Sequence, residues 1–216
     1  TGREEAVKRK PRENKRRGRS VGPIPEQILL HGREDVVGAI SSTLSEGSSI
    51  LMEGLPGVGK TTVAASLAES LLEGGWLVRW ATCQTDSDPS SIAGMWFAGR
   101  SPSSKEAISA RADSKKTLLV LDEAQQASSR HSNYIQEMLE ACSETSAAVL
   151  VVTRAPNPFT GISGFESFRL EGLEPSMARS LLPEEMGEEE AMEVCLAMDG
   201  HPLGIKLWSP DDDLPG

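Results

Sequence analysis

The chain has 216 residues and a net charge of −10, with 38% hydrophobic and 25% charged residues. This composition is typical of a globular protein with its own core and excludes a mostly disordered chain. Aromatic residues make up only 4%, which argues against a base-stacking platform for single-stranded nucleic acid. No apolar run approaches the roughly 18 residues that a membrane span needs, so we expect no membrane partner.

The three cysteines lie far apart and form no CxxC pair (Cys83, Cys142 and Cys195). Their spacing excludes a disulfide scaffold and matches no zinc-binding pattern. The first residues also lack the apolar segment of a signal peptide. We therefore expect a reducing, cytoplasmic setting.

Charge is divided unevenly along the chain. The first twenty residues hold nine bases and three acids, a net charge of +6, so the remainder carries −16. Because residues 1–21 hold few apolar side chains, we predict that they form a basic flexible arm. Two interpretations of this arm stay open: a solvated linker to an upstream domain, or a contact with DNA phosphates.

Apolar periodicity predicts alternating helices and strands in a core spanning residues 22–172. Two of the expected strands, 117–121 and 147–153, are apolar almost throughout, which is typical of strands buried on both faces of a parallel sheet. We therefore predict an α/β fold with three layers, a central parallel sheet with helices on both faces. In chain order, the expected elements are a helix at 35–44, a strand at 50–53, a helix at 60–72, a strand at 76–81, helices at 92–97 and 105–113, a strand at 117–121, a helix at 133–142, and strands at 147–153 and 168–170.

After Pro175 the pattern becomes helical, with expected helices at 177–182, 188–198 and 202–208. Residues 173–208 are therefore predicted to form a small helical annex. Residues 209–216 are read as an acidic linker tail, because they are rich in Asp and Pro.

Residues 54–61 match the pattern GxxxxGK[ST] of a phosphate-binding loop. The loop follows an apolar strand and opens a helix, which is the context that such a loop requires. Its glycines let backbone N–H groups approach phosphate oxygens, Lys60 reaches the β- and γ-phosphates, and the Thr61 hydroxyl is suited to ligate Mg²⁺. The candidate nucleotide-binding residues here are Gly54, Leu55, Pro56, Gly57, Val58, Gly59, Lys60, Thr61 and Thr62.

Two further strands end in polar residues at the edge where ligands of α/β proteins bind. The strand at 117–121 is followed by Asp122, a candidate Mg²⁺ ligand with Thr61, and by Glu123, a candidate base that polarises the attacking water. The strand at 147–153 leads to Arg154, a candidate catalytic cation that senses the γ-phosphate. These patterns predict hydrolysis of the nucleotide as well as binding.

The order of the motifs resembles the STAND class of signal-transduction P-loop ATPases, which are relatives of the AP-ATPase and NB-ARC modules. The resemblance covers roughly residues 22–208 and implies the ASCE type of P-loop fold, as a fragment of a larger protein. It rests on HGRE (31–34), GLPGVGKTT (54–62), LLVLDEA (118–124), VVTR (151–154), LEGLEP (170–175) and GHPLGIKL (200–207).

The resemblance also implies roles for individual residues. Gly32 and Arg33 are expected near the adenine, and Ile24 and Pro25 are assigned there less firmly. Pro202 of the G-x-P element is expected close to the nucleotide, where it couples the annex to the nucleotide state.

The function that follows is a switch, closed with ADP and open with ATP, in a signalling or transcription-regulatory protein. The expected partners are sensor and effector domains outside this chain, including an upstream DNA-binding domain, and the switch could form a nucleotide-dependent oligomer.

Two other functions stay open. One is a motor or loader ATPase of the AAA+ type that acts on DNA or protein, for which an arginine supplied by a neighbouring subunit would be diagnostic. Arg130 lies in the loop after the Asp122 strand, but nothing in the sequence shows that it faces a neighbouring subunit. The other is a scaffold that binds nucleotide without turnover, against which Glu123 argues.

Overall fold

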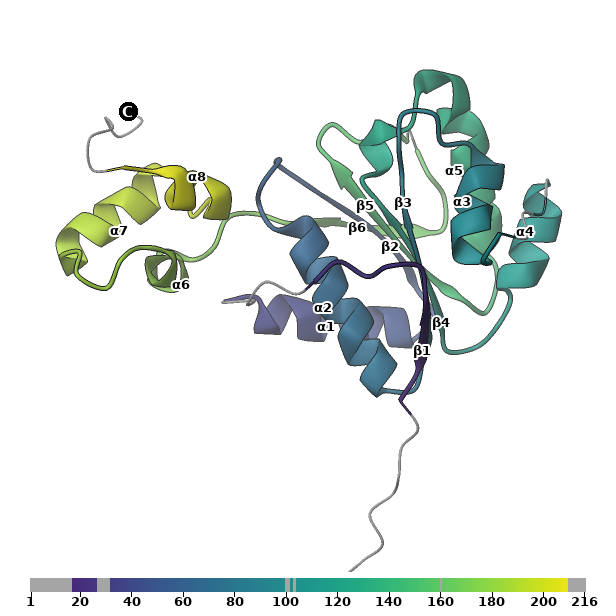
Figure 1. Cartoon of the computed structure of the whole chain (residues 1–216), viewed down its shortest axis with the longest axis horizontal. Coiled ribbons are helices and arrows are strands. Elements are labelled where there is room, and N and C mark those ends of the chain that lie inside the picture. The colour runs from purple at the N-terminus through teal and green to yellow at the C-terminus, as the bar shows by residue number, and fades with distance from the viewer. Residues whose placement is uncertain (1–16, 27–31, 100–101, 103, 160, 210–216) are drawn as a thin grey trace, which may run out of the picture.

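The structure is a computed structural model that describes residues 17–26, 32–99, 102, 104–159 and 161–209. Its core is a six-stranded, wholly parallel sheet with the strand order β1-β3-β4-β5-β2-β6 (Figure 1). The central strands are apolar and buried, as the sequence predicts. The strands are β1 (Arg19–Val21), β2 (Ser49–Gly54), β3 (Leu77–Thr82), β4 (Thr117–Asp122), β5 (Ala148–Arg154) and β6 (Phe165–Arg169).

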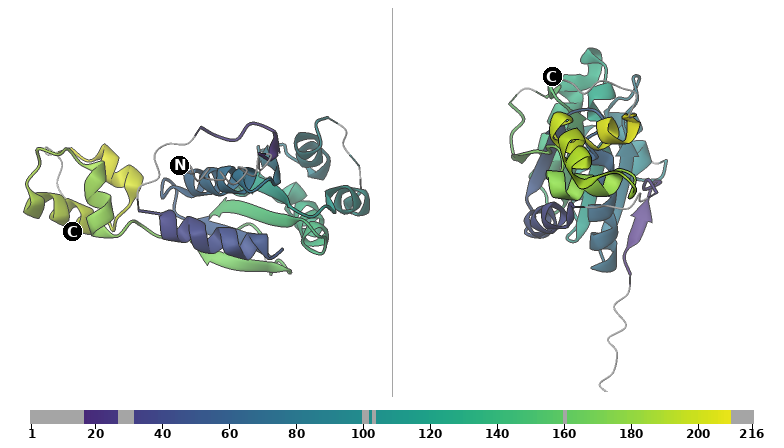
Figure 2. Two further views of the ribbon diagram at one scale, coloured as in Figure 1. Left: turned by 90° about the horizontal axis from the view of Figure 1, so that it is seen from below. Right: turned by 90° about the vertical axis from the view of Figure 1, so that its left-hand side faces the viewer.

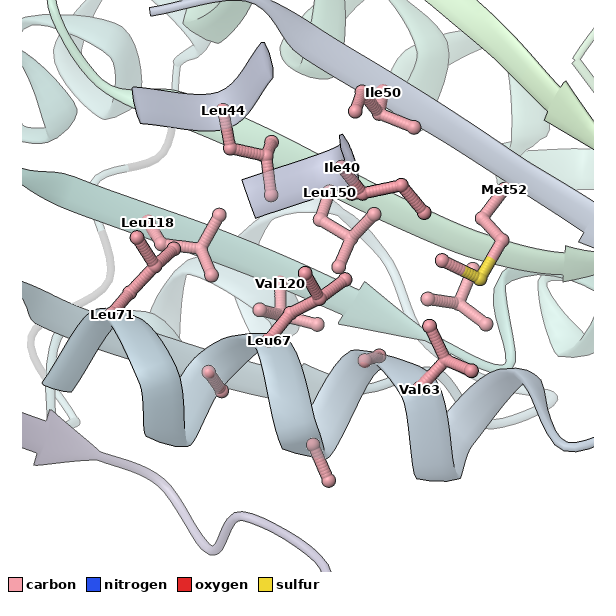
Figure 3. Close-up of a cluster of buried hydrophobic side chains, with 14 of the residues drawn as sticks. Ile40, Leu44, Ile50, Met52, Val63, Leu67, Leu71, Leu118, Val120 and Leu150 are labelled. Atoms are coloured by element: carbon pink, nitrogen blue, oxygen red, sulfur yellow. The ribbon is translucent and has the colours of Figure 1, made fainter. Parts of the chain in front are cut away.

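Helices cover both faces of the sheet. The helices α1 (Glu34–Ser45) and α2 (Lys60–Glu73) pack on one face, where their apolar side chains meet those of β2, β4 and β5 (Figure 3). On the opposite face lie α3 (Pro89–Trp96), α4 (Lys105–Ala112) and α5 (Ser129–Ser143), around a second apolar cluster. The three-layer α/β prediction is therefore confirmed. None of the helices in the described ranges is long and apolar enough to span a membrane.

A second, smaller unit follows β6 and forms a separate lobe beside the core (Figures 1 and 2). It consists of α6 (Pro175–Ala178), the 3₁₀ turn η2 (Arg179–Leu181), α7 (Glu188–Ala197) and α8 (Pro202–Leu207). Its own apolar cluster extends from Leu173 to Ile205, with Trp208 packed against it. We call residues 173–208 the annex, the range that the sequence predicts to be helical.

Strand β1 differs from the sequence prediction, which assigns residues 1–21 to a flexible arm. Arg19–Val21 instead pair in parallel with β3 at the edge of the sheet, and the Gly18 N–H donates to Leu72 O. A Cβ at position 18 would lie 1.8 Å from Trp76 O, so the absence of a side chain allows this approach. Backbone pairing orders the segment although its side chains supply little apolar surface. Residues 1–16 of the predicted arm and 210–216 of the predicted tail lie outside the described residues.

Candidate nucleotide-binding site

The strand order brings the predicted site residues to one edge of the sheet. Gly54 at the end of β2 lies opposite Arg154 at the end of β5. On the other side of β5 is β4, which ends at Asp122. Strand β5 thus lies between the phosphate-loop strand β2 and the aspartate strand β4. This strand order is the one expected of the ASCE type. Because all strands are parallel, the loop, the carboxylates and the arginine converge on the same edge.

A cleft of about 310 Å³ opens at this edge, between the core and the annex. From the core it is lined by loop residues 56–62, Val63, Arg33, Glu123 and Arg154. From the annex side it is lined by Leu173, Leu181, Pro202, Leu203 and Lys206. Four cations and one carboxylate therefore line a cleft in a protein of net charge −10, which suits a polyanionic ligand.

The phosphate loop runs from the end of β2 to the start of α2. Gly57 and Gly59 have φ angles of +81° and +101°, which other residues rarely adopt, so the glycines of the motif are required by the backbone. Gly54 and Leu55 are in the motif but not in the wall of the cleft, and they hold the loop through their carbonyl oxygens.

Lys60 lies in the first turn of α2, and its side chain is largely buried. Its Nζ donates to Gly54 O at 3.0 Å and Leu55 O at 2.8 Å. Burial lowers the pKa of Lys60, whereas the nearby Glu123 carboxylate raises it. The ammonium is therefore held inside the loop, at the floor of the cleft, where phosphate charge would replace the carbonyl partners.

Thr61 and Asp122 lie together as the sequence predicts. The Thr61 hydroxyl donates to the Asp122 carboxylate, with Oγ1 3.1 Å from Oδ1 and 3.2 Å from Oδ2. Asp122 is only 2% exposed, and burial raises its pKa to about 6 against the hydrogen bonds from Glu123 N and Thr61. A bound cation would offset this desolvation of the carboxylate.

These two side chains fit a Mg²⁺ site. A hydroxyl and a carboxylate are the hard oxygen donors that Mg²⁺ prefers, and nucleotide-bound Mg²⁺ usually has few protein ligands, with phosphates and water completing its shell. Within the described residues, no group of three or more His, Cys, Asp or Glu residues that could hold a metal occurs. Asp122 and Thr61 would hold the ion, which would neutralise phosphate charge.

Glu123 follows Asp122 in a left-handed conformation, with φ +54°, which is uncommon for a residue other than glycine. Its carboxylate accepts a hydrogen bond from Gln125 Nε2 and lies 3.4 Å from Arg154 Nη2. Both side chains of the ion pair are partly exposed to the cleft. The structure therefore brings together the predicted base and the predicted phosphate sensor, which neutralise one another in this conformation.

The two residues expected near the adenine occupy different positions. Arg33 lines the cleft and is 8% exposed, and its guanidinium donates to the carbonyl oxygens of Val58 and Glu171. It therefore joins the phosphate loop to the segment that leads into the annex. Gly32 lies outside the cleft wall and against α6, since a Cβ there would be 2.5 Å from Met177 Cβ. His31 of the same motif is outside the described residues, and Ile24 packs against the first apolar cluster.

Pro202, which is predicted to lie close to the nucleotide, lines the cleft, and so do neighbouring residues for which the sequence predicts no role. Leu203 and Lys206 line the same wall, and His201 contacts the phosphate loop, with Nε2 2.8 Å from Pro56 O. These residues belong to the GHPLGIKL motif, so the motif itself was the available signal. Leu173 belongs to the LEGLEP segment and Leu181 to no motif, and neither was given a role because both look like ordinary core leucines.

A phosphate loop after β2, an Asp-Glu pair after β4 and a cationic cleft at the carboxyl edge of a parallel sheet define the class of P-loop nucleotide-binding proteins. Residues 50–163 match the model of the ATPase family associated with various cellular activities (AAA), and the chain belongs to this family. No curated protein matches the chain.

The fold is also similar to a solved structure, a Signal Transduction ATPase with Numerous Domains (STAND) protein with a tetratricopeptide repeat sensor from Pyrococcus horikoshii. The TM-score is 0.59 at 18% identity, and the match covers 89% of this chain and 32% of that protein. The chain therefore has the P-loop ATPase fold of a STAND protein and spans about a third of that protein's length.

Proposed function

We propose that this chain is a nucleotide-dependent switch module that binds ATP or ADP with Mg²⁺, hydrolyses ATP slowly and changes the contact between core and annex with the nucleotide state. The observation that carries the proposal is the composition of the cleft, whose walls come from the phosphate loop and from the annex. A ligand between two units shifts their relative position by its differential affinity for the two arrangements. We assign the arrangement seen here to the closed, ADP-type state.

The site residues have separate roles in this proposal. Residues 54–62 hold the phosphates, with Lys60 as their cation. Thr61 and Asp122 hold Mg²⁺, and Glu123 orients and polarises the attacking water. Arg33 lies on the core side of the cleft, where we assign it to the adenine end of the nucleotide, and Pro202 contacts the nucleotide when the annex is closed.

Arg154 would respond to the γ-phosphate. Its ion pair with Glu123 is partly exposed, so it contributes at most about 1 kcal/mol. A γ-phosphate in the cleft would compete for the guanidinium and release Glu123 to act on water. The pair would thus keep the base neutralised until ATP arrives.

Nucleotide binding is tested by calorimetry with ATP and ADP in the presence of Mg²⁺. Lys60→Ala should weaken binding by roughly 30- to 1000-fold, because it removes the ammonium that pairs with phosphate charge. Lys105→Ala is the matched control, since Lys105 is an exposed lysine on α4 that pairs with Glu137 away from the cleft. Equal affinities of the wild type and Lys60→Ala would refute the proposal.

The switch would act within a larger signalling or transcription-regulatory assembly. We propose that sensor and effector domains, fused or separate, read the position of the annex, and that DNA is reached through an upstream domain or the basic residues 1–16. The STAND protein with the similar fold carries a tetratricopeptide repeat sensor, which is one form that such a domain takes. The three cysteines are free and buried, which suits a reducing, cytoplasmic setting.

A motor or loader ATPase remains the second candidate, because Arg130 is exposed in the first turn of α5. An exposed arginine there is available to the active site of a neighbouring subunit in a nucleotide-dependent oligomer. Mixing Arg130→Ala with Lys60→Ala subunits tests this. Recovery of hydrolysis in the mixture would favour the motor, and no recovery would favour the switch.

A further inference from the structure

His201 makes two hydrogen bonds that join the annex to the phosphate loop. Its Nδ1 accepts from the Gly204 N–H at 3.0 Å and so caps the N-terminus of α8. Its Nε2 lies 2.8 Å from Pro56 O. Because a backbone N–H can only donate, Nδ1 must be unprotonated. The proton is therefore on Nε2, which donates to the Pro56 carbonyl.

This second bond holds the carbonyl end of a peptide in the loop, within a turn that the Val58 N–H closes by donating to Leu55 O. The Pro56–Gly57 peptide is trans, so the N–H of Gly57 points away from the carbonyl that His201 holds. Among the described residues no atom accepts a hydrogen bond from the Gly57 N–H. Gly57 also lines the cleft. Its donor is thus free for an anionic ligand, and the carbonyl of the same peptide is held by His201.

Apolar packing supports the same contact. A Cβ at Gly57 would lie 2.7 Å from both Cβ and Cδ2 of Leu203, and 3.0 Å from His201 Cε1. The first turn of α8 therefore rests directly on the backbone of the loop. Any displacement of α8 from the loop would break the His201–Pro56 bond.

We propose that His201 is a positioning residue for phosphate binding: it holds the Pro56–Gly57 peptide so that the Gly57 N–H is directed at a phosphate oxygen. The inference rests on the proposed nucleotide function and deepens it. It makes the annex a part of the phosphate site as well as a cap over it. Loss of the annex contact would allow the peptide to rotate and would weaken phosphate binding.

His201→Asn separates the two hydrogen bonds. Asparagine is a good N-cap and keeps an acceptor for the Gly204 N–H, but its shorter side chain does not reach Pro56. Leu207→Ala is the matched control on the same helix, because Leu207 is 72% exposed and outside the cleft wall. Two measurements are made on each protein: the affinity for ADP with Mg²⁺ by calorimetry, and the ¹⁵N–¹H signal and hydrogen exchange of the Gly57 amide by NMR.

For His201→Asn we expect about 3- to 10-fold weaker ADP binding, the worth of one hydrogen bond. The Gly57 amide should shift and exchange faster, while the Gly204 amide stays protected. Leu207→Ala should match the wild type in both measurements. An unchanged Gly57 amide in His201→Asn would overturn the inference even if affinity falls, because His201 would then act only through packing of the annex.

Failure of the positioning role of His201 can be distinguished from failure of the proposed nucleotide function. If the wild type binds no ADP, that function fails, yet the Gly57 amide of the nucleotide-free protein still reports on the positioning by His201. The ¹⁵N spectrum of the wild-type imidazole gives a check that needs no variant. We expect the tautomer with the proton on Nε2, and the other tautomer would overturn the inference.

Discussion

Glu123→Gln separates nucleotide binding from hydrolysis. The amide keeps the shape of the side chain and an oxygen that can accept from Gln125 and Arg154, but it removes the charge that polarises water. The lost ion pair is 3.4 Å long and its side chains are 44% and 32% exposed, so its contribution to stability is below about 1 kcal/mol. In a chain of this size the melting temperature should fall by no more than about 4 °C.

Turnover should respond far more strongly. Loss of a general base typically lowers the rate by about 10²- to 10⁴-fold. The assay is single-turnover hydrolysis at saturating ATP and Mg²⁺, with affinity measured separately by calorimetry. Glu137→Gln is the control, because it breaks an ion pair of similar exposure with Lys105, outside the cleft. An unchanged hydrolysis rate in Glu123→Gln would show that another group activates the water.

Pro202, Asp122 and the basic N-terminal residues each allow a separate test. Pro202→Ala should weaken ADP binding more than ATP binding, because the proline lines the closed cleft. Equal effects in calorimetry would argue against a contact that is made only in the closed state. In the nucleotide-free protein, the pKa of Asp122 is raised from 3.8 to about 6, so the folded state holds the proton more tightly than the unfolded state. As pH rises through this range, the free energy of unfolding should fall by up to about 3 kcal/mol. Denaturant titrations of Asp122→Asn should lack this pH-dependent loss. Deleting residues 1–16 removes seven of the nine bases among the first twenty residues but keeps β1. Any weak, salt-sensitive DNA binding measured by anisotropy titration should then disappear. Retained binding would exclude these residues as its source.

The sequence predicts most of the core because its signals are local. Apolar strands at 117–121 and 147–153 leave no alternative to a buried parallel sheet, and parallel strands bring their carboxyl ends to one edge. The closeness of Lys60, Asp122 and Arg154 follows from that geometry alone. The ion pair between Arg154 and Glu123, by contrast, could be found only from the side-chain positions in the structure.

The contacts that the sequence does not reveal are made by backbone atoms over long separations. Strand β1 is ordered by backbone hydrogen bonds to β3, and its basic side chains give no sequence signal for this pairing. Arg33 binds carbonyl oxygens of Val58 and Glu171, an interaction with no residue-type signature. His201 reaches Pro56 across 145 residues, and the motif draws attention to the neighbouring proline instead.

Hydrogen exchange of residues 196–208 in the nucleotide-free, ADP-bound and ATP-bound protein measures whether the annex responds to the nucleotide state. These residues include the end of α7 and all of α8, whose first turn rests on the phosphate loop. We expect the greatest protection with ADP and a clear loss of protection with ATP under conditions that prevent hydrolysis. Identical protection in all three states would show that the annex is a passive cover over an ATPase core and not a switch element.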